Sequence, residues 1–366
     1  MSSDVLTTRA LNRALLARQM LLRRENIKPV AAVERLAGMQ AQVPRPPFVG
    51  LWSRVEGFQR EHLIKAVKSH ELLRGTLMRG TLHLASRKDF KAFRNALAPD
   101  LARITKSILR DRADIVGLPR LIAAARKFFD EEPRTFAEFR EHVKSAFPGL
   151  DERAVAYTVR LHLPLIQAPR SGETWGYPAN ADFALAEQWL KDTNSKQTPQ
   201  QHIALSYFAA FGPATVRDFA SWSGLSGASA VVEELRPKLV TFRDEAKREL
   251  FDLPKAPRPD EDEPAPVRFL PEYDNLLLGH ADRTRVVSSE HRPKLMTRNL
   301  FLPGTFLFDV FCAGIWKADL KKKAAQLAIY SFVKLSKQSR AALEEEGERL
   351  LQFMMPEAQS HSIAFN

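Results

Sequence analysis

Two glutamines separated by one residue, Gln40 and Gln42, carry the spacing that could support chemistry. Gly38 is well placed to end the helix before them, and Pro44 biases Val43 toward an extended conformation. In an extended chain, residues two apart point to the same side, whereas on a helix they diverge by about 200°. An amide has no titratable proton, so the pair could position a ligand but could not act as a general base. The alternative is two ordinary surface glutamines at the end of a helix.

The common catalytic signatures are absent from the sequence. It has no GxSxG, no Walker loop and no GxGxxG, and its nine His residues show neither HxxxH nor HExxH spacing. We therefore expect no metal and no cofactor. Cys312 is the only cysteine, which excludes an internal disulfide and fits a reducing, cytoplasmic location. Its apolar neighbours predict a buried structural thiol.

The chain is basic, and the excess is confined to one part of it. The formal net charge is +12 and the pI is about 9.8. Residues 1–130 hold 25 Lys and Arg against 11 Asp and Glu, a net +14, which leaves the rest near −2. This asymmetry predicts a footprint for a polyanion, with a solvated basic surface as the alternative. Nucleic acid is favoured over a membrane surface because the basic helices carry no aromatic-rich face for a bilayer. No run approaches the ~20 apolar residues of a membrane helix, and the N-terminus lacks the apolar run of a secretory signal.

A mainly helical α+β fold is expected from the periodicity. Helices are predicted over 8–24, capped by Thr7 or Thr8, and over 29–37. A pattern of helix followed by paired strands then recurs three times. We expect helices and strands at 60–70, 72–78 and 81–86 in the first copy; 134–147, 151–163 and 164–179 in the second; and 199–210, 214–224, 228–238 and 239–253 in the third. Helix, turn, helix and two-stranded ribbon is the layout of a winged helix-turn-helix.

The pattern divides the chain into five parts. They are a basic region with the first winged helix at 1–130, a second winged helix at 131–195, a third at 196–254, an acidic Pro-rich linker at 255–266 and a β-rich unit at 267–366. The last unit contains a helix at 336–354 and a strand at 284–289, and its final residues are expected to be poorly ordered.

Candidate DNA contacts fall into two groups. Basic residues near the glutamines or the first strand pair are expected to contact backbone phosphates; these are Arg45, Arg79, Lys88 and Arg94. The polar turn GHADRTR supplies the second group, in a loop that could enter a groove or form a solvated hairpin; these are His280, Arg283 and Arg285. We interpret His83 as structural, and Asp274 and Asn275 as turn-forming residues.

Four blocks of the sequence resemble the AlkZ-type DNA glycosylases, which are related to the YcaQ branch. They are MQAQVPRPPFVGLWSRV, LLRGTLMRGTLHL, LPEYDNLLLGHADRTRVV and GTFLFDVFCAGIW, in the family's order. The family signature is Gln–apolar–Gln, and the YcaQ-related branch has Asp at the second position, where this chain has Gln42. The resemblance implies three winged-helix motifs around a concave DNA channel, a C-terminal β-unit, and excision of alkylated purines, including N7-alkylguanine and some interstrand crosslinks. The signature glutamines correspond to Gln40 and Gln42.

Amides suit a substrate that is already activated. Base excision usually needs a carboxylate, but an N7-alkylguanine carries a positive charge and leaves as a neutral base. Two amide oxygens could hold a water beside C1′ and stabilise developing positive charge. Together with the resemblance, the sequence therefore predicts a monomeric, monofunctional glycosylase that acts on alkylated duplex DNA through an open channel. We expect the protein to be associated with the nucleoid when it is bound to DNA. The alternative is a non-enzymatic winged-helix protein, either a regulator or a lesion binder.

Overall fold

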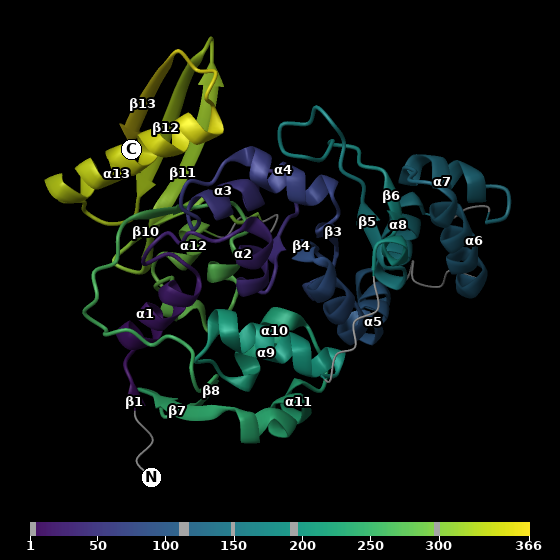
Figure 1. Cartoon of the computed structure of the whole chain (residues 1–366), viewed down its shortest axis with the longest axis horizontal. Coiled ribbons are helices and arrows are strands. Elements are labelled where there is room, and N and C mark those ends of the chain that lie inside the picture. The colour runs from purple at the N-terminus through teal and green to yellow at the C-terminus, as the bar shows by residue number, and fades with distance from the viewer. Residues whose placement is uncertain (1–4, 110–116, 148–150, 191–196, 296–300) are drawn as a thin grey trace.

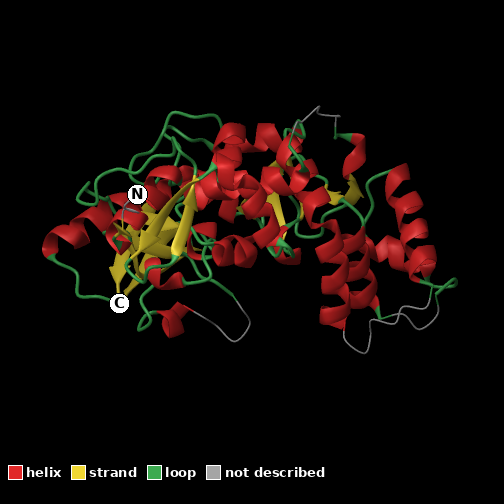
Figure 2. Ribbon diagram, turned by 90° about the horizontal axis from the view of Figure 1, so that it is seen from below, coloured by secondary structure: helices red, strands yellow, loops and turns green. Residues whose placement is uncertain are grey.

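The computed structural model describes residues 5–109, 117–147, 151–190, 197–295 and 301–366. They form an α+β fold with three sheets (Figure 1). The C-terminal sheet with its helix lies at one end of the molecule and helices α6 and α7 at the other (Figures 1 and 2). No helix in the described part of the chain is long and apolar enough to cross a membrane.

The first helices begin where predicted and end earlier. Thr7 caps α1, because its side chain accepts a hydrogen bond of 3.0 Å from the backbone N–H of Ala10. This helix stops short of the predicted residue 24, since Met20 adopts a φ of +56°. Gly38 follows α2 at a φ of +85°, which ends that helix. The first helices are α1 (Thr8–Arg18), α2 (Pro29–Arg35), α3 (Pro46–Trp52) and α4 (Arg60–Lys68).

The first two predicted units share one five-stranded sheet. Its order is β2-β4-β3-β5-β6, with β2 (Met39–Gln40), β3 (Leu72–Thr76), β4 (Leu82–Ser86), β5 (Leu165–Gln167) and β6 (Phe183–Leu185). The predicted strand pair within 164–179 was wrong, because β5 pairs with β6, which lies beyond that range. Helices α5 (Arg87–Leu109), α6 (Leu118–Glu131), α7 (Phe136–Val143) and α8 (Glu152–His162) complete this half.

The third predicted unit shows its elements where the pattern placed them. They are α9 (Pro199–Phe211), α10 (Val216–Ser223), α11 (Ala228–Leu235), β7 (Val240–Asp244) and β8 (Glu249–Asp252). A capping box between Thr215 and Asp218 begins α10, and Gly224 ends it at a φ of +74°. The short strand β1 (Val5–Leu6) adds to β7 in parallel, which was not predicted. That these elements form a winged-helix motif stays a prediction.

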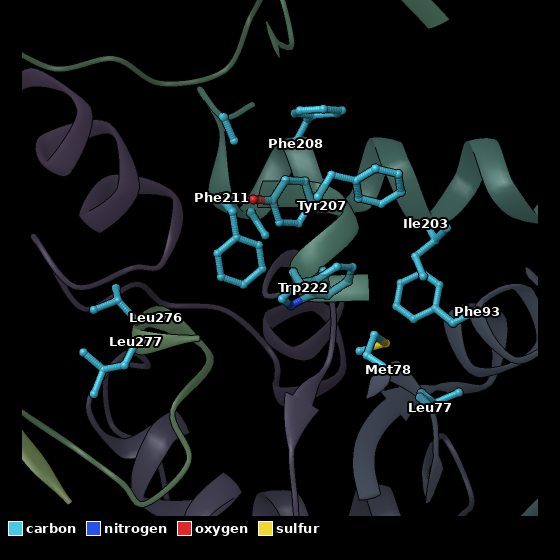
Figure 3. Packing of buried hydrophobic residues seen from close by; sticks show 14 of the residues in the cluster. Leu77, Met78, Phe93, Ile203, Tyr207, Phe208, Phe211, Trp222, Leu276 and Leu277 are labelled. Carbon is cyan, nitrogen blue, oxygen red and sulfur yellow. The ribbon is translucent and has the colours of Figure 1, made fainter. Parts of the chain in front are cut away.

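One large core joins parts of the chain that the sequence pattern separates. Tyr207, Phe211 and Trp222, from α9 and α10, pack around one another with ring centroids 5.2–5.7 Å apart. In the same cluster lie Met78, from the turn between β3 and β4, and Leu276, from the C-terminal third (Figure 3). The β3–β4 turn and the segment around Leu276 are therefore packed against the third unit.

The C-terminal unit is built on a sheet of order β13-β12-β11-β10-β9. Its strands are β9 (Arg268–Leu270), β10 (Thr305–Phe308), β11 (Phe311–Lys321), β12 (Ala324–Ser331) and β13 (Ser360–Phe365), and α13 (Lys337–Met354) packs on it. The tail predicted to be poorly ordered is strand β13, paired in parallel with β12. The predicted strand at 284–289 is absent. Short helices stand at Asn275–Leu277 (η5), Arg283–Arg285 (η6) and Arg292–Leu295 (α12).

The acidic segment 255–266 contains no helix or strand, and it holds the arginines of α1. Arg13 donates to the carbonyl of Glu263 and pairs with Asp309 at 2.8 Å. Arg18 donates to the carbonyl of Pro257 and pairs with Asp252 at 2.6 Å. Both arginines are buried. These two charges, which the sequence counted toward a polyanion footprint, are neutralised inside the protein.

Candidate active site

A cavity of about 580 Å³ contains both glutamines. Three separate parts of the chain line it. The region of β2, β3 and β4 contributes Gln40, Gln42, Thr76, Arg79, Gly80, Thr81 and Leu82; α8 contributes Tyr157, Arg160 and Leu161; and the C-terminal third contributes Tyr273, Leu278, Arg283, Leu295, Phe301 and Leu302.

The glutamine motif has the extended conformation that the sequence predicted. Gln40 stands opposite His83 in the β2–β4 pairing, and the N–H of Ala41 donates to the carbonyl of Leu82 at 2.8 Å. The methyl group of Ala41 is fully buried, whereas Gln40 and Gln42 both line the cavity. The alternation of an extended chain therefore brings the two amides to the same side.

A buried arginine that sequence reasoning missed holds the main chain of this motif. Arg74, on β3, donates from Nε to the carbonyl of Ala41 at 2.9 Å and from Nη2 to that of Gln42 at 3.2 Å. Burial lowers the pKa of its guanidinium to about 10, so the group stays charged at neutral pH. No motif or spacing in the sequence marks Arg74 as a functional residue. Its place in the strand pattern of β3 predicts only that its side chain faces inward.

Each glutamine oxygen receives a hydrogen bond from a group that can only donate. Arg79 Nη2 lies 3.2 Å from Gln40 Oε1, and the N–H of Leu82 lies 3.4 Å from Gln42 Oε1. A guanidinium and a backbone N–H cannot accept hydrogen bonds, so the oxygen of each amide must face its donor. One lone pair on each oxygen and the amide NH₂ groups remain for a ligand.

Arg79 has a different environment from the phosphate-contacting surface that we expected. It occupies a left-handed turn, η1 (Met78–Gly80), at a φ of +56°. Its guanidinium donates to the carbonyl of Trp222 on α10 as well as to Gln40. Burial, with a smaller contribution from Arg283, lowers its pKa to about 10. The side chain thus bridges α10 and the glutamine motif.

The charge in the cavity is of one sign. Arg79, Arg160 and Arg283 line it, and no Asp or Glu does so among the described residues. Glu272 is next to Tyr273 in sequence, but its carboxylate pairs with Arg45. No group of three His, Cys, Asp or Glu residues in the described ranges is placed to hold a metal ion.

Three of the predicted DNA contacts point into the protein. Arg94 donates to the carbonyls of Leu161 and Leu163 at 2.7 and 2.9 Å. Arg285 donates to the carbonyls of Pro213 and Leu11, and His280 contacts the carbonyl of Phe211. The side chains of Arg285 and His280 therefore face the protein interior from the GHADRTR turn. All three are buried. Direct contact with a phosphate is therefore not expected of Arg94, His280 or Arg285, contrary to the interpretation from sequence.

The other predicted contacts are accessible to different degrees. Arg283 lines the cavity, and its side chain makes no hydrogen bond or ion pair with the described residues. Lys88 is exposed on the first turn of α5 and does not line the cavity. Arg45 is half-buried against Glu272. The sequence did not predict the aromatic residues of the cavity, because a single aromatic residue in a helix or loop has no distinctive spacing. These residues are Tyr157, Tyr273 and Phe301.

The two ionisable groups beside Gln40 keep their charge state around neutral pH. His83 is buried behind Gln40, and burial together with Arg79 lowers its pKa to about 3, so its imidazole is neutral above that pH. Arg79 stays protonated below its pKa of about 10. For the base excision that the resemblance implies, the ratio of enzymatic to spontaneous base release should therefore be constant between about pH 5 and pH 9. The measurement is the single-turnover rate on a cationic lesion as a function of pH. A ratio that falls with a midpoint near neutral pH would contradict the expectation, because it would indicate a general base that titrates there.

The comparisons with known proteins agree on one relationship. A family model described as "DNA glycosylase AlkZ-like" matches residues 33–353. An "Interstrand DNA cross-link repair glycosylase" from Streptomyces sahachiroi is 23% identical over 347 residues, which cover 82% of this chain and 85% of the relative. The solved structure of the Streptomyces sahachiroi DNA glycosylase AlkZ superposes with a TM-score of 0.78 at 19% identity, covering 99% of this chain and 100% of that one.

An α+β protein with paired amides in an arginine-lined cavity, matched by that family model, falls into the class of the DNA glycosylases. The model spans most of the chain, so this protein belongs to the AlkZ-like DNA glycosylase family. The resemblance stated from the sequence blocks is thereby confirmed.

Proposed function

We propose that this protein removes alkylated purines, N7-alkylguanine in particular, from duplex DNA by hydrolysing the N-glycosidic bond with a water held by Gln40 and Gln42. The observation that carries the proposal is the pair of fixed amide oxygens in a cavity without a lining carboxylate among the described residues. The relative named for interstrand crosslink repair extends the proposal to crosslinked purines.

The reaction needs positioning more than proton transfer. The water oxygen bonds to C1′ while the C1′–N9 bond breaks. The electron pair of the broken bond stays on N9 and neutralises the cationic ring of the base. The proton lost by the water passes to solvent. The free lone pairs of the two amide oxygens hold the water and stabilise positive charge at C1′ by their dipoles. A neutral base lacks this activation, so we expect no release of uracil.

The cavity has room for the adduct as well as the nucleotide. Its volume of about 580 Å³ falls in the range of ~300–1,000 Å³ typical of small-ligand sites. Arg283, Arg160, Lys88 and Arg45 are the proposed phosphate contacts. We further propose that the three predicted winged-helix motifs form the channel that carries the duplex to this cavity.

The test is base release from two duplexes of the same sequence. One carries N7-methylguanine and the other uracil, and alkali-labile abasic sites are counted after single-turnover incubation. Release from the first duplex alone is expected. Clear uracil excision would sink the cationic leaving-group mechanism. Binding of both duplexes without release from either would favour the non-enzymatic DNA-binding alternative.

A further inference from the structure

We propose that Tyr273 stacks on the base to be excised and selects a cationic purine over a neutral one. This inference rests on the proposed function and deepens it, because it assigns the recognition of the lesion to a residue outside the glutamine motif. It starts from the way the chain around Tyr273 is anchored.

Every polar neighbour of Tyr273 is tied to the segment around the glutamines. Glu272 pairs with Arg45. Asp274 pairs with buried Arg54 at 2.9 Å, and Asn275 donates to the carbonyl of Gly38 at 3.3 Å. Tyr273 itself contributes only its backbone, whose N–H donates to the carbonyl of Leu302 at 3.3 Å. Its hydroxyl has no hydrogen-bond partner among the described residues, and its ring lines the cavity.

The backbone of Tyr273 is held in an unfavourable conformation. Its φ is +58°, in the left-handed region that L-residues other than glycine rarely adopt. Such conformations persist where the surroundings over-determine them, and they cluster at ligand-binding sites. The anchors at residues 272, 274 and 275 meet that condition. This conformation directs the ring of Tyr273 into the cavity, although its hydroxyl makes no hydrogen bond with the described residues.

Charge explains why an aromatic ring is required there. A cationic base enters a cavity lined by Arg79, Arg160 and Arg283 and by no carboxylate among the described residues. Apart from the amide oxygens, the groups that attract a cation are the faces of aromatic rings. The Arg160 guanidinium already lies 5.0 Å from the Tyr157 ring centroid. Tyr273 packs on one side against the large core and meets the ring of Phe301 edge to face at 5.5 Å. The side chain is only half-buried and lines the cavity, so part of the ring is open to the base.

The test compares Tyr273→Leu with the wild type on an N7-methylguanine duplex. Loss of one base–aromatic contact should lower the single-turnover rate at sub-saturating protein by about 10-fold. The Kd for undamaged duplex should stay within about 2-fold, because the contact is with the lesion. Tyr273→Phe keeps the ring and should recover most of the loss. Tyr330→Leu is the matched control, since Tyr330 is also a partly exposed tyrosine, on β12 and outside the cavity.

Two results would overturn the proposal. One is an unchanged rate in Tyr273→Leu with its melting temperature preserved. The other is an equal loss of affinity for damaged and undamaged duplex, which indicates a general DNA contact. A second measurement does not depend on catalysis: saturation-transfer NMR should show that wild type binds 7-methylguanosine more tightly than guanosine, and that Tyr273→Leu loses the difference. If the wild type releases no base, the proposed function fails, and this binding comparison still decides the role of Tyr273.

Discussion

Base release from an N7-methylguanine duplex should fall roughly 100-fold or more in the double variant Gln40→Ala/Gln42→Ala, with duplex affinity almost unchanged. In the proposed mechanism both amide oxygens hold the water, and alanine removes their dipoles at the point where charge develops. The single variant Gln42→Asp should retain more activity than Gln42→Ala, because a carboxylate can still accept a hydrogen bond from water. Single-turnover rates at saturating protein measure the chemical step directly.

The control for this experiment is Gln326→Ala. Gln326 is an exposed strand residue on β12, outside the cavity, so its loss tests the effect of removing an amide from a sheet. It should leave the rate unchanged. The proposal is contradicted if the double variant releases base at the wild-type rate. If affinity is lost in parallel with the rate, the glutamines serve binding and not the chemical step.

Arg79→Met should lower the saturated single-turnover rate by as much as about 100-fold, because a misplaced catalytic group can cost that much. Methionine cannot donate to Gln40 Oε1, so the amide becomes free to rotate its oxygen away from the water. Arg79→Lys should restore part of the rate, since an ammonium group can still donate. The measurement is the rate together with the slope of log affinity against log salt concentration.

The salt slope separates positioning from phosphate contact. Each lost phosphate contact reduces the slope by about 0.9, whereas a positioning residue leaves it unchanged. We expect Arg79→Met to change the rate and not the slope. Lys88→Met, at an exposed site, should do the opposite. If Arg79→Met changes the slope and leaves the saturated rate intact, the role inferred from sequence was right and the positioning role is wrong.

Local signals in the sequence were sufficient for the glutamine motif. The glycine before it and the proline after it specify an extended segment without reference to the rest of the chain. The capping residue Thr7 marked a helix start for the same reason. The strands β6 and β13 escaped prediction because each is defined by a partner distant in sequence. Their own residues do not alternate clearly enough to identify them.

The function of an arginine was the least predictable part of the site. Arg94 and Arg285 looked like phosphate contacts, yet their guanidinium groups satisfy backbone carbonyls inside the protein. Arg74 was not considered, although it holds the main chain of the motif. A guanidinium has five donors and suits either environment equally well. Charge counting along the chain therefore cannot separate a structural arginine from one that meets DNA.

The bond from Arg79 to the carbonyl of Trp222 makes the predicted units mutually dependent. The Gln40 amide belongs to the N-terminal part of the chain, but the arginine that orients it is itself held by α10 of the third predicted unit. Because the acceptor is a main-chain carbonyl, a change that moves the backbone of α10 would misalign the Gln40 amide, whereas a change of side chain at Trp222 would leave the acceptor in place.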